Sequence, residues 1–165
     1  MLGTAILDPE RVEADVSETA GLGLLDVVTE FAPEKQTVRV EGEAGGGAGV
    51  FAELAGCRFH GYEIHHGVTH RGAAPGWLRV FRRANDEVET EDGAIRPDGL
   101  VAGCYIHGLF DADAFRGALI SALAARRGRV STAAVFSREA AFERLAVHVR
   151  RHLDLAAVRR IAGLG

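Results

Sequence analysis

The residues that decide the fold are 101–111, with the sequence VAGCYIHGLFD. The first part of this run is almost wholly apolar, which predicts a strand over 100–107 in the interior of a sheet, covered on both faces. Gly108 breaks the strand, and Asp111 is a residue type that often caps a helix. His107 therefore stands at the carboxyl end of a strand, where ligands and catalytic groups gather in α/β proteins.

The residues before this run predict further strands. Polar and apolar residues alternate, or apolar residues cluster, in six segments: 37–41, 50–54, 58–66, 77–83, 88–90 and 94–95. Ala55-Gly56 is expected to turn one hairpin and Asp92-Gly93 another. Residues 1–7 are apolar and compatible with a helix, which Asp8-Pro9 would end.

The residues after this run predict two helices. The first is expected to begin at Asp111 and to stop at Gly128. The second is expected to be capped by Ser137 and to carry one apolar face. Strands followed by helices indicate an α/β fold, in which His107 lies where strand and helix meet.

Composition and charge restrict the class of protein. The chain has 165 residues, 47% of them hydrophobic and 25% charged, which is consistent with one globular domain over 1–165. A net charge of -4 gives no reason to expect nucleic acid or an anionic membrane as partner. No apolar run approaches the ~18 residues of a membrane span, and two cysteines make no disulfide framework. A cytoplasmic location is expected.

His107 is the main candidate for catalysis. A histidine at a strand end can act as a general base, and it can equally hydrogen-bond a neighbouring loop. Cys104 precedes it by three residues, an odd spacing that puts the two side chains on opposite faces of a strand. The same holds for Cys57 and His60, and no serine lies in a Gly-x-Ser-x-Gly elbow. The residues thus offer a base without a nucleophile, and Cys104 is expected to be a buried structural thiol.

A second group of polar residues lies in 60–70, HGYEIHHGVTH. On a strand, Glu63 and His65 share one face. The other face carries His60, Tyr62, Ile64 and His66. This division splits the side chains that would bind a metal, and the spacing matches no Cys-x-x-Cys or His-Glu-x-x-His motif. We expect no metal site, and favour Glu63 and His65 as a polar pair facing a substrate pocket over ordinary strand polarity.

The glycine-rich run 43–49, EAGGGAG, invites comparison with a phosphate-binding loop. Such a loop ends in Gly-Lys-Ser/Thr, whereas Val50-Phe51 follows here. A flexible connection is expected.

Several stretches together resemble the glutamine amidotransferase domain of cobyric acid synthase. They are ETAGLGLLDVVTEF at 18–31, Lys35, GYEIH at 61–65 and YIHGLFD at 105–111. They occur in the family's order and cover nearly the whole chain. The related cobyrinate diamide synthases share the His-Gly element but match the GLGLL run less well.

The resemblance implies a class I glutamine amidotransferase-like three-layer sandwich. In this family a cysteine attacks the glutamine amide, forms a thioester and releases ammonia, while a histidine moves the protons. His107 matches that histidine, and Glu63, His65 and Tyr105 are expected to bind substrate. No cofactor is expected in this domain. ATP and Mg²⁺ act in a separate N-terminal domain, which amidates adenosylcobyrinic acid a,c-diamide, so that glutamine and a corrinoid are the expected partners.

Two departures from the family qualify this expectation. The family's nucleophile lies in a Cys-Gly-Gly-x-Gln-Met-Leu-Gly elbow, of which Met1-Leu2-Gly3 would be the end. We therefore expect a partial domain, without the elbow and the N-terminal strands, that is inactive alone. Many class I glutaminases also carry a glutamate two residues after the histidine, and Leu109 stands there. Two alternatives stay open: a glutaminase subunit of another amidotransferase, such as the peptidoglycan type, and a non-catalytic binding module.

Overall fold

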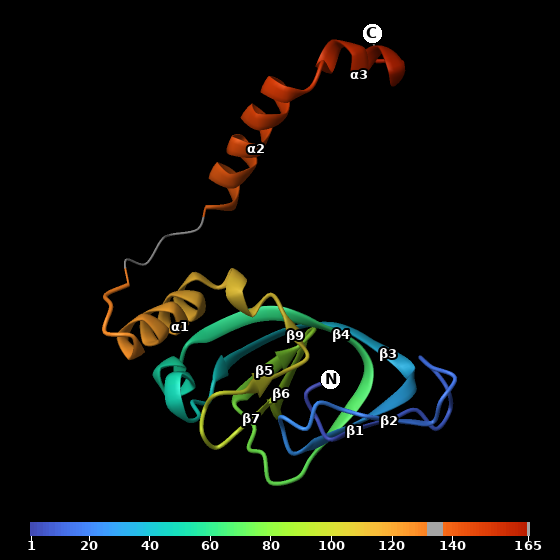
Figure 1. Ribbon diagram of the computed structural model, residues 1–165, viewed down its shortest axis with the longest axis vertical. Helices are drawn as coiled ribbons and strands as arrows, with labels where there is room; N and C mark the ends of the chain where they lie inside the picture. The colour runs from blue at the N-terminus through green and yellow to red at the C-terminus, as the bar shows by residue number, and fades with distance from the viewer. Residues whose placement is uncertain (132–136, 165) are drawn as a thin grey trace. The chain divides into compact units, whose positions relative to one another are not determined.

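The computed structural model describes residues 1–131 and 137–164, and divides into two compact units. The first unit, Met1–Ala133, contains all the strands of the described chain together with helix α1 (Figure 1). The second, Ala134–Gly165, contains helices α2 and α3. The architecture is mixed α/β, as the sequence predicts.

One sheet organises the first unit. Its strands are β1 (Ala5–Leu7), β2 (Glu18–Ala20), β3 (Val27–Ala44), β4 (Arg58–Arg71), β5 (Leu78–Arg83), β6 (Asp86–Asp92) and β9 (Ile106–His107). The order is β2-β1-β3-β4-β9, and β5 pairs with both β3 and β6. Within the described residues, β1 and β3 are the one parallel pair of this sheet.

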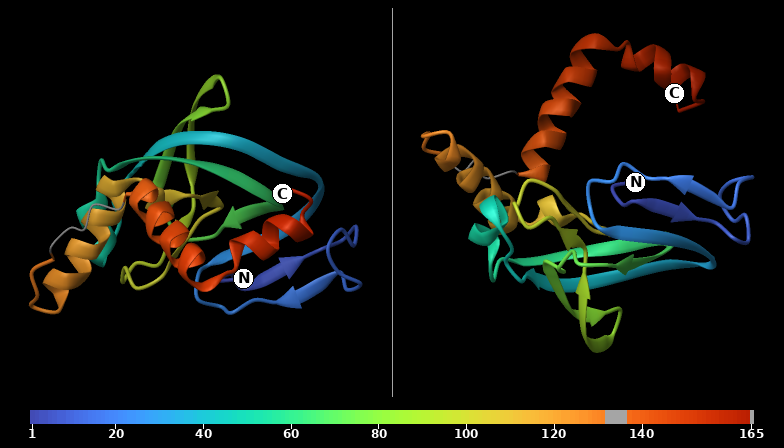
Figure 2. Two further views of the ribbon diagram at one scale, coloured as in Figure 1. Left: turned by 90° about the horizontal axis from the view of Figure 1, so that it is seen from above. Right: turned by 60° about the horizontal axis from the view of Figure 1, so that its bottom comes forward.

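The long strands β3 and β4 run side by side through the middle of the sheet (Figure 1). Their register is interrupted between Phe31 and Gln36, close to Pro33, which has no N–H to donate to a neighbouring strand. Beyond this break the free edge of β3 changes partner, from β1 to β5. The hairpin of β5 and β6 accordingly leaves the plane of the two long strands (Figure 2).

Side chains of β4 alternate between a buried and an exposed face. Phe59, Glu63 and Gly67 are buried, whereas Tyr62 and Ile64 are exposed. This is the period-two alternation that the sequence predicts, and it divides Glu63 from Tyr62.

The core lies between the buried sheet face and the short helices η1 (Gly49–Leu54), η2 (Leu109–Asp111) and α1 (Asp113–Arg126). Phe115 of α1 is fully buried at its centre. Its ring meets the rings of Phe59 and Trp77 at centroid distances of 6.2 Å each. Burying a phenylalanine of this kind contributes about 1.5–3 kcal/mol to the stability of the fold. This burial anchors α1 to β4, the strand that carries Glu63 and His65.

The helix boundaries follow local signals, with one exception. Gly128, with φ +64°, ends the first helix, and the Oγ of Ser137 accepts the backbone N–H of Ala140 at the start of α2 (Arg138–His152). Both expectations are confirmed. Asp111 is not the cap of α1, because it belongs to η2 and Ala112 holds the cap position. Helix α3 (Leu155–Ile161) follows, and no helix within 1–131 or 137–164 is long and apolar enough to cross a membrane.

Two segments take a different secondary structure from the one expected. Residues 1–7 include the strand β1 rather than a helix, because β2 and β3 supply hydrogen-bonding edges on both sides of it. Residues 50–54 form η1 rather than a strand, which leaves no hairpin about Ala55-Gly56. In both cases tertiary partners override a short apolar pattern.

Two strand pairings also differ. Asp92-Gly93 turns no hairpin, because β7 (Ala94–Ile95) pairs with β8 (Ala102–Gly103) while β6 returns against β5. The expected strand over 100–107 is divided into β8 and β9, which belong to different sheets. Its residues are mostly half-buried, not covered on both faces. The apolar run therefore has two pairing partners: β8 pairs with β7, and β9 pairs with β4.

Candidate functional site

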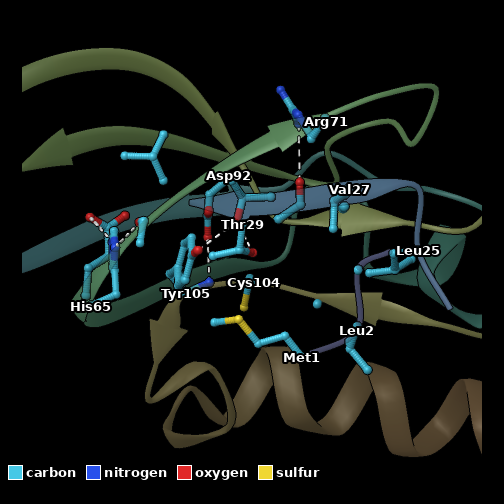
Figure 3. A pocket seen from close by; sticks show the side chains of 18 of the residues that line it. Met1, Leu2, Leu25, Val27, Thr29, His65, Arg71, Asp92, Cys104 and Tyr105 are labelled. Atoms are coloured by element: carbon cyan, nitrogen blue, oxygen red, sulfur yellow. Dashed lines mark hydrogen bonds and ion pairs between the residues drawn. The ribbon is translucent and has the colours of Figure 1, made fainter. Parts of the chain in front are cut away.

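A cavity of about 440 Å³ opens against the buried face of β4 (Figure 3). The rest of its lining comes from the start of β3, the first three residues, Leu25, Arg83 and segments 91–94 and 103–105. Glu63, His65 and Tyr105, the three residues expected to bind substrate, all line it. The structure therefore brings these three together, although Tyr105 comes from a different part of the chain.

Glu63 is 3% exposed, and both of its carboxylate oxygens are engaged by one arginine. The Nε of Arg83 donates to Oε2 at 3.1 Å and its Nη2 donates to Oε1 at 2.8 Å. This hydrogen-bonded pair raises the pKa of Arg83 above its usual value. A buried carboxylate requires such a partner, so Glu63 holds β4 to β5 through a bidentate ion pair.

His65 and Tyr105 stack on each other at a centroid distance of 3.9 Å and an angle of 16°. The ring Nδ1 of His65 lies 2.7 Å from the carbonyl oxygen of Gly67. Because a carbonyl oxygen only accepts, this nitrogen carries the proton, and Nε2 is left 4.0 Å from Glu63 Oε2. The Tyr105 hydroxyl in turn lies 2.6 Å from the Oγ1 of Thr69. These contacts link His65, Tyr105 and Thr69 along the cavity wall.

Asp92 and Cys104 complete this wall and were not identified as site residues from the sequence. The backbone N–H of Tyr105 donates to Asp92 Oδ2 at 3.3 Å. Burial, and then the charge of Glu63, raises the pKa of Asp92. Burial and then the charge of Asp92 raise the pKa of the Cys104 thiol to about 12. A protonated thiol is a poor nucleophile, which agrees with a structural role for Cys104.

His107 belongs to β9 and lies on the opposite, exposed face of the sheet, which it shares with Tyr62 of β4. It pairs in register with Tyr62, and the two rings stack at a centroid distance of 5.1 Å and an angle of 5°. Ile106, beside it, pairs with Glu63 and is buried. The sheet therefore separates His107 from the cavity that holds Glu63, His65 and Tyr105.

The backbone at His107 is closely constrained. Gly108 has φ +82°, a left-handed conformation that a side chain disfavours, so glycine suits the turn. Gly61 lets the two strands approach, because a Cβ there would lie 2.3 Å from the carbonyl oxygen of His107. Leu109 is 6% exposed and belongs to the core. It cannot orient the imidazole, and the ring of Tyr62 is the group that lies against it.

The possible metal ligands of the described residues are dispersed, and only part of the glycine-rich run 43–49 is buried. Across 1–131 and 137–164, no three His, Cys, Asp or Glu side chains are grouped closely enough to hold a metal. The expected glycine-rich connection is shortened because β3 extends to Ala44. Gly45, Gly47 and Gly49 in its remainder are exposed, and a Cβ at Gly47 would lie 2.7 Å from the Cδ1 of Ile95.

The CobB/CobQ-like glutamine amidotransferase domain family matches residues 1–115. The chain is also 40% identical over 171 residues to the cobyric acid synthase of Syntrophobacter fumaroxidans. This alignment covers 99% of the chain and 33% of the relative. The cobyric acid synthase of Pelotomaculum thermopropionicum is 42% identical over 179 residues, with coverages of 99% and 33%. That of Dehalococcoides mccartyi strain 195 is 36% identical over 166 residues, with coverages of 100% and 33%.

These relatives agree with the resemblance seen in the GLGLL, GYEIH and YIHGLFD stretches. The chain spans about a third of the length of the curated relatives it matches. The matched region of the family includes β1 to β9, and hence both the cavity and His107. From the combined agreement of motifs, fold and family match, the chain belongs to the CobB/CobQ-like glutamine amidotransferase domains.

Proposed function

We propose that this chain supplies the proton-transfer histidine of a glutamine amidotransferase in cobalamin biosynthesis. The observation that carries the proposal is His107: an exposed imidazole at the end of β9, followed by the glycine turn at Gly108, within the region that matches the family. Ammonia from glutamine would serve the amidation of adenosylcobyrinic acid a,c-diamide by an ATP- and Mg²⁺-dependent domain. Glutamine and a corrinoid are then the substrates of the complete cytoplasmic enzyme.

In the proposed reaction His107 accepts the proton of a cysteine thiol as the sulfur attacks the glutamine side-chain carbonyl carbon. It then gives that proton to the leaving ammonia, which breaks the C–N bond and leaves a thioester. Water hydrolyses the thioester to glutamate, with His107 taking a proton from the water and returning it to the sulfur. The chemistry requires a thiol beside the exposed face of His107.

Neither cysteine of the chain meets this requirement. Cys104 lines the cavity on the other side of the sheet, with its pKa raised to about 12, and its thiol lies 3.6 Å from the backbone oxygen of Ile106. Cys57 packs against the core before the start of β4. We therefore propose that the 165 residues alone have no glutaminase activity, and that the nucleophile comes from outside them.

The test uses the chain alone and joined to a relative. Purified chain incubated with glutamine should release no ammonia above the uncatalysed background. A chimera in which residues 1–165 replace the matching segment of the Syntrophobacter fumaroxidans cobyric acid synthase should hydrolyse glutamine. His107→Ala should reduce that activity at least ~100-fold, the lower range for loss of a general acid-base group.

The matched control for this substitution is His60→Ala. His60 is exposed on the same face of β4, and its replacement should leave the chimera active. Full glutaminase activity in the His107→Ala chimera, or ammonia release by the chain alone, would contradict the proposal.

A further inference from the structure

To pass a proton from the thiol to the leaving ammonia, the imidazole of His107 has to present one ring nitrogen in a defined direction. Its backbone is set by the pairing with β4 and by the turn at Gly108, but the ring still rotates about its own side-chain bonds. The position two residues later, at which many class I glutaminases hold an orienting glutamate, carries the buried Leu109. That position therefore supplies no polar group that could orient the ring.

Tyr62 lies at the required place. It is the direct cross-strand partner of His107, and directly opposed residues of an antiparallel pair project from the same face of a sheet. The ring planes differ by 5° with centroids 5.1 Å apart, which is the geometry of an offset stack. Tyr62 is nevertheless 45% exposed, so its ring covers the imidazole more than it fills the core.

We propose that Tyr62 is the positioning residue for His107, and that it acts through the face of its ring. The inference rests on the proposed function of His107 in proton transfer. A stacked ring restricts rotation of the imidazole while it occupies neither ring nitrogen, since both nitrogens lie at the edge. A carboxylate in the same role would engage one of the two. The stack thus orients the base and leaves free the nitrogen that passes the proton from the thiol to the leaving ammonia.

The same two segments contain a second stack with the residue types exchanged. His65 of β4 stacks on Tyr105, and Tyr62 of β4 receives His107. The two histidines are held differently, because the Nδ1 of His65 is also bonded to the carbonyl oxygen of Gly67. The His65 ring is thus committed at one nitrogen, which suits a structural position, and the His107 ring is held by its face.

The first test reads the orientation of His107 without any catalysis. The imidazole C–H protons of His107 are assigned in NMR spectra of the 165-residue chain and compared among variants. Protons above the face of an aromatic ring move upfield, so the native chain and Tyr62→Phe should show the displacement, and Tyr62→Leu should lose it. Ile64→Ala, an exposed change on the same face of β4, is the control and should keep it.

The second test measures kcat and KM for glutamine in the chimera with the cobyric acid synthase of Syntrophobacter fumaroxidans. Tyr62→Leu should lower kcat about 2- to 10-fold, the range expected for losing one aromatic stack, with little change in KM. Tyr62→Phe should restore kcat.

Two results would overturn the proposal. One is a Tyr62→Leu chain with an unchanged His107 spectrum. The other is a Tyr62→Phe chimera as slow as Tyr62→Leu, which would assign the effect to the hydroxyl. Failure of the proposed function gives a different result from both. In that case the His107→Ala chimera would stay active, while the native chain would still show the upfield displacement of the His107 protons.

Discussion

The ion pair between Glu63 and Arg83 yields the most direct prediction about stability. Replacing Arg83 by methionine keeps most of the side-chain volume but leaves the Glu63 carboxylate buried, at 3% exposure, without its two hydrogen bonds. Breaking a buried pair in this way costs about 3–5 kcal/mol. The side chain of Arg83 is itself 36% exposed, so water can reach the vacated space. We therefore expect the lower end of the range, about 3 kcal/mol.

The assay is urea unfolding of the purified chain, followed by the fluorescence of Trp77, which is its one tryptophan and is buried. With a denaturant slope of about 1–3 kcal/mol per molar, the midpoint should fall by about 1–3 M. Arg82→Met is the matched control, because Arg82 neighbours Arg83 on β5 and is exposed. It should change stability by less than about 0.5 kcal/mol.

A double variant separates the cost of the unpaired charge from that of lost packing. Glu63→Leu combined with Arg83→Met removes the uncompensated carboxylate and should recover most of the lost stability. Equal midpoints for Arg83→Met and Arg82→Met would refute the reasoning, because Glu63 would then need no partner.

Three further predictions concern ionisation and backbone strain. The pKa of Asp92 is raised above its usual 3.8 in the folded chain, so as pH falls the folded chain binds a proton at Asp92 before the unfolded chain does. The protonated carboxyl therefore contributes stability at low pH, and this contribution is lost as pH rises through the raised pKa. Urea unfolding should therefore show a larger stability gain for Asp92→Asn at pH 7 than at pH 4, and equal gains would contradict the shift. Cys104, with its pKa raised to about 12, should resist iodoacetamide at pH 8 until urea unfolds the chain, as peptide mass spectrometry can detect; rapid labelling of the native chain would contradict this. Gly108→Ala should cost about 1–2 kcal/mol because of its φ of +82°. Gly117→Ala, in the open surroundings of α1, should instead be neutral or stabilising by up to about 1 kcal/mol, and similar melting curves for the two variants would count against strain at Gly108.

Family membership was predictable from the sequence because it depends on short, contiguous motifs. The GYEIH and YIHGLFD stretches identify the amidotransferase family, and the family match over 1–115 confirms it. The division of Glu63 and His65 from Tyr62 was also predictable, since successive side chains of a strand point to opposite faces. The roles of His107, Glu63, His65 and Tyr105 stay predictions until the variants are measured.

Other features were beyond the sequence because they depend on which segments become partners. The strand expected over 100–107 is split into β8, which pairs with β7, and β9, which pairs with β4. Residues 1–7 contain a strand because β2 and β3 flank it. Asp92 carries a sequence signal for a turn, yet it lies beside Tyr105 in the cavity wall. In each case the local pattern predicted which residues are polar or apolar, but it could not predict which distant segment they would contact.

The sequence by itself determined the motif that carries His107, the glycine that ends its strand and the face on which each residue of β4 projects. Only the tertiary structure decided that Tyr62 stacks on His107, that Arg83 neutralises Glu63, and that the sheet separates His107 from the cavity. The physical reason is that alternation along a strand is a local consequence of backbone geometry. The register between strands is set by long-range pairing and by the burial of side chains distant in the sequence.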